Sequence, residues 1–480
     1  MPDGLQHSQL TGDHSTARRT SVIARIKHAT GLDRAIGFTI LARGWSTLAG
    51  VFTVLLIARF LSPSEQGYYY TFSSLVALQV VFELGFSFVI LQLAAHERAH
   101  LVVAQDGSIT GDPISHSRLA SVLQKAVRWY TFGAILMFST LLPVGFHFFL
   151  THQQRGVSIA WRLPWVAIVL AATCTFQMDP IFAFVEGCGR VPLVARMRFT
   201  QAVGGTLMAW AALLLHHGLF APAMIIGGQA ITGACFLFTQ RSLLLPLLRH
   251  RTTNYFVSWR REIWPFQWRI ALSWLCGYFI FQLFNPVLFA YRSAAEAGRM
   301  GMSLSIAAAL STVAISWIST KASPFGSLVA QRDFATLDRV FFRTLVQSSV
   351  LLICGALVFL LALAAAERRY PLLASRVLPM PIFALLLLTT CLNHIVFSQA
   401  VYLRAHKQEP FLKLSILVGV LTGASTIGTG KLWGAAGVTI GYFIASGVVG
   451  LAVGSLIFIS KRREWHRSPA SIPVPDVNAL

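Results

Sequence analysis

Residues 61–70 read "LSPSEQGYYY" and separate two long apolar runs; they contain the pattern Ser62-x-x-Glu65-x-Gly67. The pattern returns in residues 291–300, "YRSAAEAGRM", close to half the chain further on. In each copy the serine can cap a helix, the glutamate lies near the positive end of the helix dipole, and the glycine permits a close backbone approach. Ser-x-x-Glu is also a common capping pattern, so two chance matches are the competing interpretation. Because both copies join apolar runs at corresponding places, we favour an internal repeat.

The composition predicts an integral membrane protein with little mass outside the bilayer. Of the 480 residues, 55% are hydrophobic and 12% are charged, and the mean hydropathy is +0.63. A soluble domain carries about 25% charged residues. The formal net charge of +21 would also suit nucleic acid, but basic loops beside the cytoplasmic ends of membrane spans explain it better. No nucleic acid partner is therefore expected.

The sequence offers little for catalysis or metal binding. The six cysteines are scattered along apolar runs without a Cys-x-x-Cys pair, so neither a disulfide framework nor a zinc site is expected. Residues 423–433, "GASTIGTGKLW", miss the Walker A pattern, and no Gly-x-Ser-x-Gly motif is present. We expect a transporter rather than an enzyme or an ATP-driven pump, without a bound cofactor.

The apolar runs predict an even number of membrane spans, which places both termini on one side. A spanning helix needs about 20 apolar residues. The segments that then face the cytoplasm carry most of the basic residues, as the positive-inside rule requires, although they are also the longer ones. The twelve runs lie near residues 35–58, 68–94, 129–150, 163–186, 199–217, 219–240, 270–290, 300–320, 344–366, 380–403, 414–428 and 434–460.

The repeat divides these runs into two six-helix lobes. Parallel repeats of this kind are typical of transporters whose binding site lies between the halves. The expected fold class is an all-α integral membrane protein with about 12 transmembrane helices. The expected segments are a basic cytoplasmic tail (1–34), an N-terminal lobe (35–240), a cytoplasmic linker (241–269), a C-terminal lobe (270–460) and a cytoplasmic tail (461–480).

Three charged residues lie deep within predicted spans, where an ionisable side chain is costly and marks a candidate site. Arg43 could bind a phosphate through two hydrogen bonds from its guanidinium group, or it could form a structural pair with another side chain. Glu83, deep in the second run, could pair with Arg43 or bind a coupling cation or proton. Asp179 precedes Pro180, which we expect to break the fourth helix and leave a polar notch, either a cation site or a capped kink.

The seventh run, which corresponds to the first in the repeat, carries a second group of candidates. Arg269 begins this run and is either a second cavity cation or a cytoplasmic anchor. Gln282 and Asn285 form a polar notch beside Pro286 and are candidates for substrate contact. His394 in the tenth run is expected to hydrogen-bond between helices rather than to relay protons.

Several stretches resemble bacterial polysaccharide/O-antigen flippases. Residues 55–97, "LLIARFLSPSEQGYYYTFSSLVALQVVFELGFSFVILQLAAHE", look like their first hairpin, and residues 298–338 look like their eighth helix and the cytoplasmic stretch after it. "YLRAHKQEPF" (402–411) and "LWGAAGVTIGY" (432–442) are similar to their late helices. These flippases form the polysaccharide transporter family of the multidrug/oligosaccharidyl-lipid/polysaccharide (MOP) exporter superfamily. The resemblance covers most of the chain and carries no catalytic signature.

The resemblance implies a V-shaped, MATE-like arrangement of two six-helix lobes that alternates between inward-open and outward-open states. It implies a flippase that moves an oligosaccharide linked to undecaprenyl pyrophosphate across the bacterial cytoplasmic (inner) membrane, with both termini in the cytoplasm. The implied partners are this lipid-linked oligosaccharide and membrane lipids, with a polysaccharide polymerase and assembly proteins as further candidates.

The same resemblance suggests what each candidate residue would do. The pyrophosphate would need cationic groups in the central cavity, for which Arg43 and Arg269 are candidates. Coupling to a proton or sodium gradient would fall to the carboxylates Glu83 and Asp179.

Three other functions stay open at this point. A multidrug exporter of the same superfamily should have an acidic and aromatic cavity for cationic drugs, which Arg43 opposes. A membrane-embedded glycan polymerase or ligase is disfavoured by the short predicted outer loops and by the repeat. A scaffold for a glycan assembly complex would differ from a transporter only in the effect of cavity mutations.

Overall fold

The computed structural model describes residues 34–103, 109–153, 158–250, 256–258, 264–406, 408 and 410–467. Helices make up nearly all of this part, and a two-stranded antiparallel hairpin is the only sheet in it. Inside a bilayer every backbone N–H and C=O group needs a partner within its own segment, and a helix supplies one to most of them. The expected all-α fold is confirmed.

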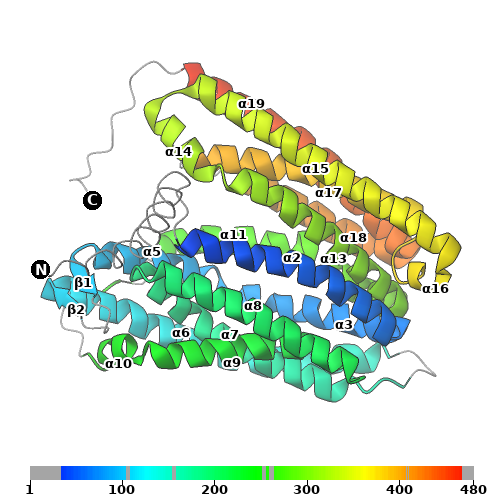
Figure 1. Ribbon diagram of the computed structural model, residues 1–480, viewed down its shortest axis with the longest axis horizontal. Helices are drawn as coiled ribbons and strands as arrows, with labels where there is room; N and C mark the ends of the chain where they lie inside the picture. Colours follow the sequence, from blue (N-terminus) through cyan, green and yellow to red (C-terminus); the bar gives the residue numbers. More distant parts are fainter. Residues whose placement is uncertain are drawn as a thin grey trace, which may run out of the picture.

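Helices α2 to α9 form the N-terminal lobe and run back and forth between the two ends of the molecule (Figure 1). Large aromatic side chains fill its core, where Phe72, Phe149 and Trp165 are fully buried and in ring contact. The elements are α2 (Arg34–Phe60), α3 (Pro63–Val76), η1 (Ala77–Gln79), α4 (Val80–Glu83), α5 (Phe86–Arg98), β1 (Leu101–Val103), β2 (Ile109–Gly111), α6 (Pro113–Thr151), α7 (Arg162–Gly187), α8 (Val191–Leu214), η2 (Gly218–Phe220) and α9 (Ala221–Thr239).

Helix α10 (Arg241–Arg249) begins the linker between the lobes and lies against α6. Its Leu243 and Leu247 are buried. Gln124 of α6 donates hydrogen bonds to the carbonyls of Leu247 (3.0 Å) and His250 (2.8 Å). The start of the linker is therefore fixed to the N-terminal lobe, while the domain boundaries given above stay predictions.

The C-terminal lobe follows and forms the other arm of a V. In Figure 1 its yellow to red helices diverge from the N-terminal lobe toward the end that carries α14 and the β1–β2 hairpin. The two lobes converge near α3, α13 and α16. The elements are α11 (Trp264–Phe281), α12 (Phe284–Tyr291), α13 (Ala294–Ser319), α14 (Ala322–Gln331), α15 (Phe334–Arg369), α16 (Pro371–Ala374), α17 (Met380–Ala405), α18 (Leu412–Tyr442), η4 (Phe443–Val449) and α19 (Gly450–Arg467).

The two Ser-x-x-Glu-x-Gly patterns both start helices, as predicted. The Ser62 hydroxyl accepts a hydrogen bond from the Glu65 amide (3.2 Å), and the Glu65 carboxylate accepts one from the Ser62 amide (2.8 Å), which is a full capping box. The Ser293 hydroxyl likewise accepts from the Glu296 amide at 3.1 Å. The Glu296 carboxylate instead accepts from the Ala435 amide at 2.6 Å, so it links α13 to α18.

The two turns also meet each other at the end where the lobes converge. A Cβ atom on Gly67 would collide with the carbonyl of Ala294, and one on Gly298 would lie 2.8 Å from the Gly67 nitrogen. The Gln66 side chain donates to the Gly298 carbonyl at 2.8 Å. The repeated glycines therefore allow α3 and α13 to pack backbone against backbone and close this end.

The last two predicted spans are antiparallel helices joined at Gly434. Gly434 has φ 61° and ψ −141°, a conformation that is accessible almost only to glycine. On either side of it the chain doubles back, because a Cβ on Gly441 would lie 2.7 Å from the Ser425 hydroxyl and one on Gly430 would lie 2.9 Å from Val438. Residues 414–428 and 434–460 thus form a helical hairpin with almost no loop.

Eight helical stretches of the described chain are long and apolar enough to cross a membrane. The number rises to ten if each of two pairs of helices, bent at a short break, is counted as one span. Leu412–His466, one of the eight, is the hairpin just described. The exact number of twelve spans stays a prediction.

The expected break of the fourth helix at Pro180 was wrong. Helix α7 runs without interruption from Arg162 to Gly187 and passes through Pro180.

Candidate functional site

A cavity of about 440 Å³ is lined mostly by the C-terminal lobe, from α13, α17, α18 and the junction of α11 with α12, and the N-terminal lobe contributes Tyr70, Ser73 and Ser74 of α3. The junction is a break in the predicted seventh span, where the chain bends by 44° between Phe281 and Phe284. Gln282 lies in this break and Asn285 lies one turn beyond it, and both line the cavity. Two of the sequence-predicted substrate-contact residues are therefore in the same central cavity.

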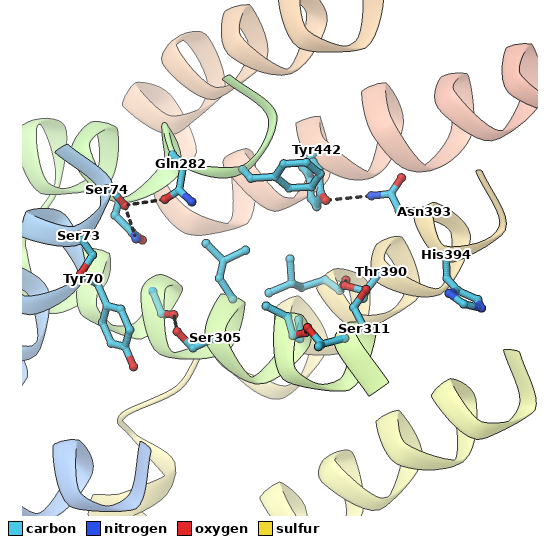
Figure 2. Close-up of a pocket in the computed structure, with 18 of the residues that line it drawn as sticks. Tyr70, Ser73, Ser74, Gln282, Ser305, Ser311, Thr390, Asn393, His394 and Tyr442 are labelled. Atoms are coloured by element: carbon cyan, nitrogen blue, oxygen red, sulfur yellow. Dashed lines mark hydrogen bonds between the residues drawn. The ribbon is translucent and has the colours of Figure 1, made fainter. Parts of the chain in front are cut away.

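Gln282 and Asn285 connect the C-terminal lobe to the N-terminal lobe through one hydroxyl group. The Asn285 amide donates to the Ser74 hydroxyl at 3.0 Å, and that hydroxyl donates to the Gln282 carbonyl oxygen at 3.5 Å (Figure 2). The carbonyl oxygen of Asn285 is buried and has no hydrogen-bond partner among the described residues. This carbonyl oxygen therefore has an unused capacity to accept a hydrogen bond from a hydroxyl or N–H group.

A second amide group lines the same cavity. Asn393 of α17 donates to the Tyr442 hydroxyl at 2.8 Å and accepts from the Ser446 hydroxyl at 3.0 Å. Figure 2 shows this pair on the same side of the view as Gln282, with Ser305 and Ser311 of α13 facing them. The cavity lining contains no Asp, Glu, Lys or Arg among the described residues. Its polar groups are amides, hydroxyls and one histidine, next to leucine, isoleucine and phenylalanine side chains.

His394 is the histidine of this lining and has the role that the sequence predicted. Its Nε2 is 2.8 Å from the Ser348 hydroxyl, so the side chain joins α17 to α15. Its Nδ1 is buried without a hydrogen-bond partner in the described part of the chain.

A second cavity, of about 350 Å³, lies inside the N-terminal lobe and contains both predicted coupling carboxylates. Glu83 of α4 and Asp179 of α7 line it together with Ser87 and Arg198. Arg198 forms an ion pair with Glu186 at 2.9 Å. The expected alternatives for Glu83 were a pair with Arg43 or a bound cation or proton. Arg43 is not among the described residues of this cavity, and Asp179 and Arg198 line it with Glu83.

Glu83 occupies a strained position that the sequence analysis missed. Leu84 (φ 50°) and Gly85 (φ 68°) are both left-handed, and the predicted second span bends by 46° at this point. A leucine in this conformation is unusual and costs free energy, so the surrounding packing must hold the break. The Glu-Leu-Gly sequence, with glycine inside an apolar run, was the available signal. The break places Glu83 at a helix end within the lobe.

The two predicted cavity arginines are not placed in either cavity. The Arg43 side chain is exposed, and it lies about 160° round α2 from Trp45, which contacts Trp210 of α8. Neither cavity lining includes it among the described residues. Arg269 lies near the start of α11, but its side chain is outside the described residues. Both assignments stay predictions.

Residues 96–100, "HERAH", match the His-Glu-x-x-His pattern of zinc proteases, which the sequence analysis missed. That pattern needs both histidines on one helix face, but α5 ends at Arg98. Glu97 is buried and forms an ion pair with Arg118 of α6 at 2.8 Å. In the part of the chain that the structure describes, no group of three potential ligands could hold a metal ion. Glu97 fastens α5 to α6.

No protein-family model matches the chain, and no curated protein matches it in sequence. Solved structures do match it. It is similar to the lipid II flippase MurJ in an inward-closed conformation, with a TM-score of 0.60 and 13% identity over 90% of each chain. It is also similar to an inward-facing multidrug resistance MATE family transporter of the MOP superfamily, with a TM-score of 0.57 and 13% identity over 87% of this chain and 99% of that one. An outward-facing MATE structure matches with a TM-score of 0.56 and 12% identity over 91% and 96%. At these identities the similarity shows a shared two-lobe helical fold.

Proposed function

We propose that this protein is a flippase that moves an oligosaccharide linked to undecaprenyl pyrophosphate from the inner to the outer leaflet of the bacterial cytoplasmic membrane. The observation that carries the proposal is the central cavity, which both lobes line and which presents amide and hydroxyl groups without a charged side chain. Sugars are polyhydroxyl compounds and are recognised by such donors and acceptors. The structural similarity to a lipid II flippase and to transporters of the MOP superfamily supports the same conclusion.

The arrangement of the lobes supports transport by alternating access. The lobes are closed at the end where Gly67 meets Gly298 and diverge toward the other end. The basic residues predict that the diverging end faces the cytoplasm, with both termini on that side. In this orientation the cavity would receive its substrate from the cytoplasmic leaflet. Opening of the Gly67–Gly298 contact would then release it outside.

The acidic cavity of the N-terminal lobe supports coupling to an ion gradient. Glu83 and Asp179 come from different helices and share this cavity, and two carboxylates near each other can hold a proton or a sodium ion between them. The cavity is separate from the central one in its lining residues. We propose that protonation or cation binding here biases the equilibrium between the two states. Arg43, exposed on α2, and Arg269 stay the proposed candidates for contact with the pyrophosphate.

A multidrug exporter is the second candidate function, favoured by the structural similarity to MATE transporters. A cationic drug would be stabilised by an acidic group in the central cavity, and its described lining contains none. A glycan polymerase or ligase and a scaffold have no specific observation in their favour.

The experiment that separates these functions uses cells in which the gene is deleted. Lipid-linked glycans are extracted and quantified, and sensitivity to cationic drugs is measured in the same cells. The flippase proposal predicts accumulation of lipid-linked intermediates that the wild-type protein clears. Unchanged glycans together with increased drug sensitivity would instead identify a drug exporter.

A further inference from the structure

A third cavity, of about 270 Å³, lies across the seam between the lobes at their closed end. Pro63 and Gln66 of α3 line it from the N-terminal lobe, and Ala295 and Arg299 of α13 line it from the C-terminal lobe. Ser375 and Arg376, from the segment between α16 and α17, complete the lining. None of these residues lines the central cavity or the acidic one.

The two arginines give this cavity a net positive charge without a paired anion. Neither Arg299 nor Arg376 forms an ion pair with another described residue, and Nη1 of Arg376 is buried without a hydrogen-bond partner in that part of the chain. A buried donor that stays unpaired costs free energy, and a charged one costs more. The site is therefore built for an acceptor that the chain itself does not supply.

The nearest carboxylate is engaged elsewhere. Glu65 lies close enough to affect Arg376, but its carboxylate accepts the Ser62 amide in the capping box. Burial lowers the pKa of the Arg376 guanidinium, and Glu65 opposes this shift. An arginine keeps its charge even so, because its ordinary pKa is above about 12. Glu65 does not line the cavity, whose two guanidinium groups therefore keep its net charge positive.

The local backbone adds to the positive potential. Pro63 is the first residue of α3 and Ala295 lies in the first turn of α13, so the cavity lies beside the positive ends of two helix dipoles. Gln66 fixes the walls relative to each other, because its side-chain amide donates to the carbonyls of Gly298 (2.8 Å) and Arg376 (2.9 Å). The walls of the site are held together only while the two lobes are in contact here.

We propose that this seam cavity, defined by Gln66, Arg299, Ser375 and Arg376, binds a phosphate or diphosphate group when the lobes are closed at this end. Two guanidinium forks and a hydroxyl match the oxygens of such a group. Under the proposed function the occupant would be the diphosphate of the carrier lipid near the end where it leaves, and this identification rests on that function. A phospholipid headgroup offers the same chemistry.

The test uses the full-length protein in a neutral detergent with inorganic pyrophosphate as the probe, and it measures binding by calorimetry. Wild type should bind saturably. The double variant Arg299→Gln/Arg376→Gln should lose about tenfold or more in affinity, as expected for two charged hydrogen-bond donors. The matched control Arg368→Gln/Arg369→Gln removes the same charge from exposed positions at the end of α15 and should bind like wild type.

One further variant keeps the proposal falsifiable. Arg376→Lys retains the charge but loses the fork, so it should bind more weakly than wild type and more tightly than the double variant, even if the double variant folds poorly. No saturable binding by wild type, or equal binding by wild type and the double variant, would overturn the proposal.

The source of the phosphate is tested by competition. Undecaprenyl diphosphate that displaces pyrophosphate at a lower concentration than phosphatidylglycerol would identify the carrier, and the reverse order would identify a lipid headgroup.

The site and the proposed function can fail separately. If glycan export is lost on gene deletion but pyrophosphate does not bind, only the seam site is wrong. If pyrophosphate binds but lipid-linked glycans are unaffected by deletion, only the flippase function is wrong.

Discussion

Gly67 of α3 and Gly298 of α13 bring two helix backbones into direct contact: a Cβ on Gly298 would lie 2.8 Å from the Gly67 nitrogen. These glycines occupy the same position in the two copies of Ser-x-x-Glu-x-Gly, one in each lobe. The repeated pattern therefore forms both helix starts and the contact between them. Any side chain at either position separates the lobes at their closed end.

Gly67→Ala should favour opening of this end. The new methyl group meets the Ala294 carbonyl, and overpacking of this kind costs about 1 to 3 kcal/mol. The readout is a cysteine at Ser73 in the central cavity, in a chain without its six native cysteines, labelled by an impermeant thiol reagent from outside. Labelling should accelerate about 5- to 100-fold. Gly227→Ala, whose Cβ would meet nothing within 4 Å, should label at the original rate. Equal rates for both alanine variants would refute a closing role for Gly67.

Gln282→Leu and Asn285→Leu should each reduce glycan export about tenfold or more without loss of protein, because each removes a polar contact in the central cavity. The measurement is the clearance of lipid-linked intermediates in a deletion strain. Gln177→Leu is the control, because its amide bonds Thr131 at 3.0 Å outside the cavity. If the control impairs export as strongly as the cavity variants, the site assignment is wrong.

Glu83→Gln and Asp179→Asn should abolish the response of transport to an imposed proton or sodium gradient, because neither neutral side chain can release a proton or hold a cation in the same way. Transport in vesicles is measured with and without each gradient. Glu367→Gln, at an exposed site near the end of α15, should leave the response intact. A gradient response that survives in both cavity variants would exclude this pair as the coupling site.

Gly434→Ala should destabilise the C-terminal lobe by about 1 to 3 kcal/mol, because alanine rarely adopts φ 61° and ψ −141°. Its methyl group would also lie 2.8 Å from Nε of Arg292 and collide with the Glu296 carboxylate. Thermal unfolding of the purified protein checks this against Gly428→Ala, which adds its methyl group in open space. Equal midpoints for the two variants would show that the chain reversal does not depend on this glycine.

Much of the fold could be predicted from the sequence because hydrocarbon imposes a simple rule. Apolar runs of spanning length must become helices, so nearly every predicted run coincides with a helix. The same rule does not locate breaks inside a run. Pro180 lies in an unbroken helix, because neighbouring packing accommodates it, while the chain breaks at Leu84 and Gly85, where the signal is a single glycine.

The candidate site could be predicted only in part. The positions of Glu83 and Asp179 within apolar runs identified them as costly charges, and the structure places both in one cavity. Arg299 and Arg376 were not distinguishable from other loop and helix-end arginines, because their proximity depends on how two distant segments fold together. The exposed side chain of Arg43 shows the converse limit: a position along a helix does not determine the face on which a residue lies.

The most direct test of the account is the leaflet in which lipid-linked glycans reside. Spheroplasts with and without the protein are treated with an impermeant reagent that labels oxidised sugars, and the labelled fraction of the extracted lipid-linked glycan is measured. The account predicts that depletion lowers the outer-leaflet fraction, that wild type restores it, and that the Gln282→Leu/Asn285→Leu variant, expressed equally, does not. An outer-leaflet fraction that is unchanged by depletion would contradict the flippase function.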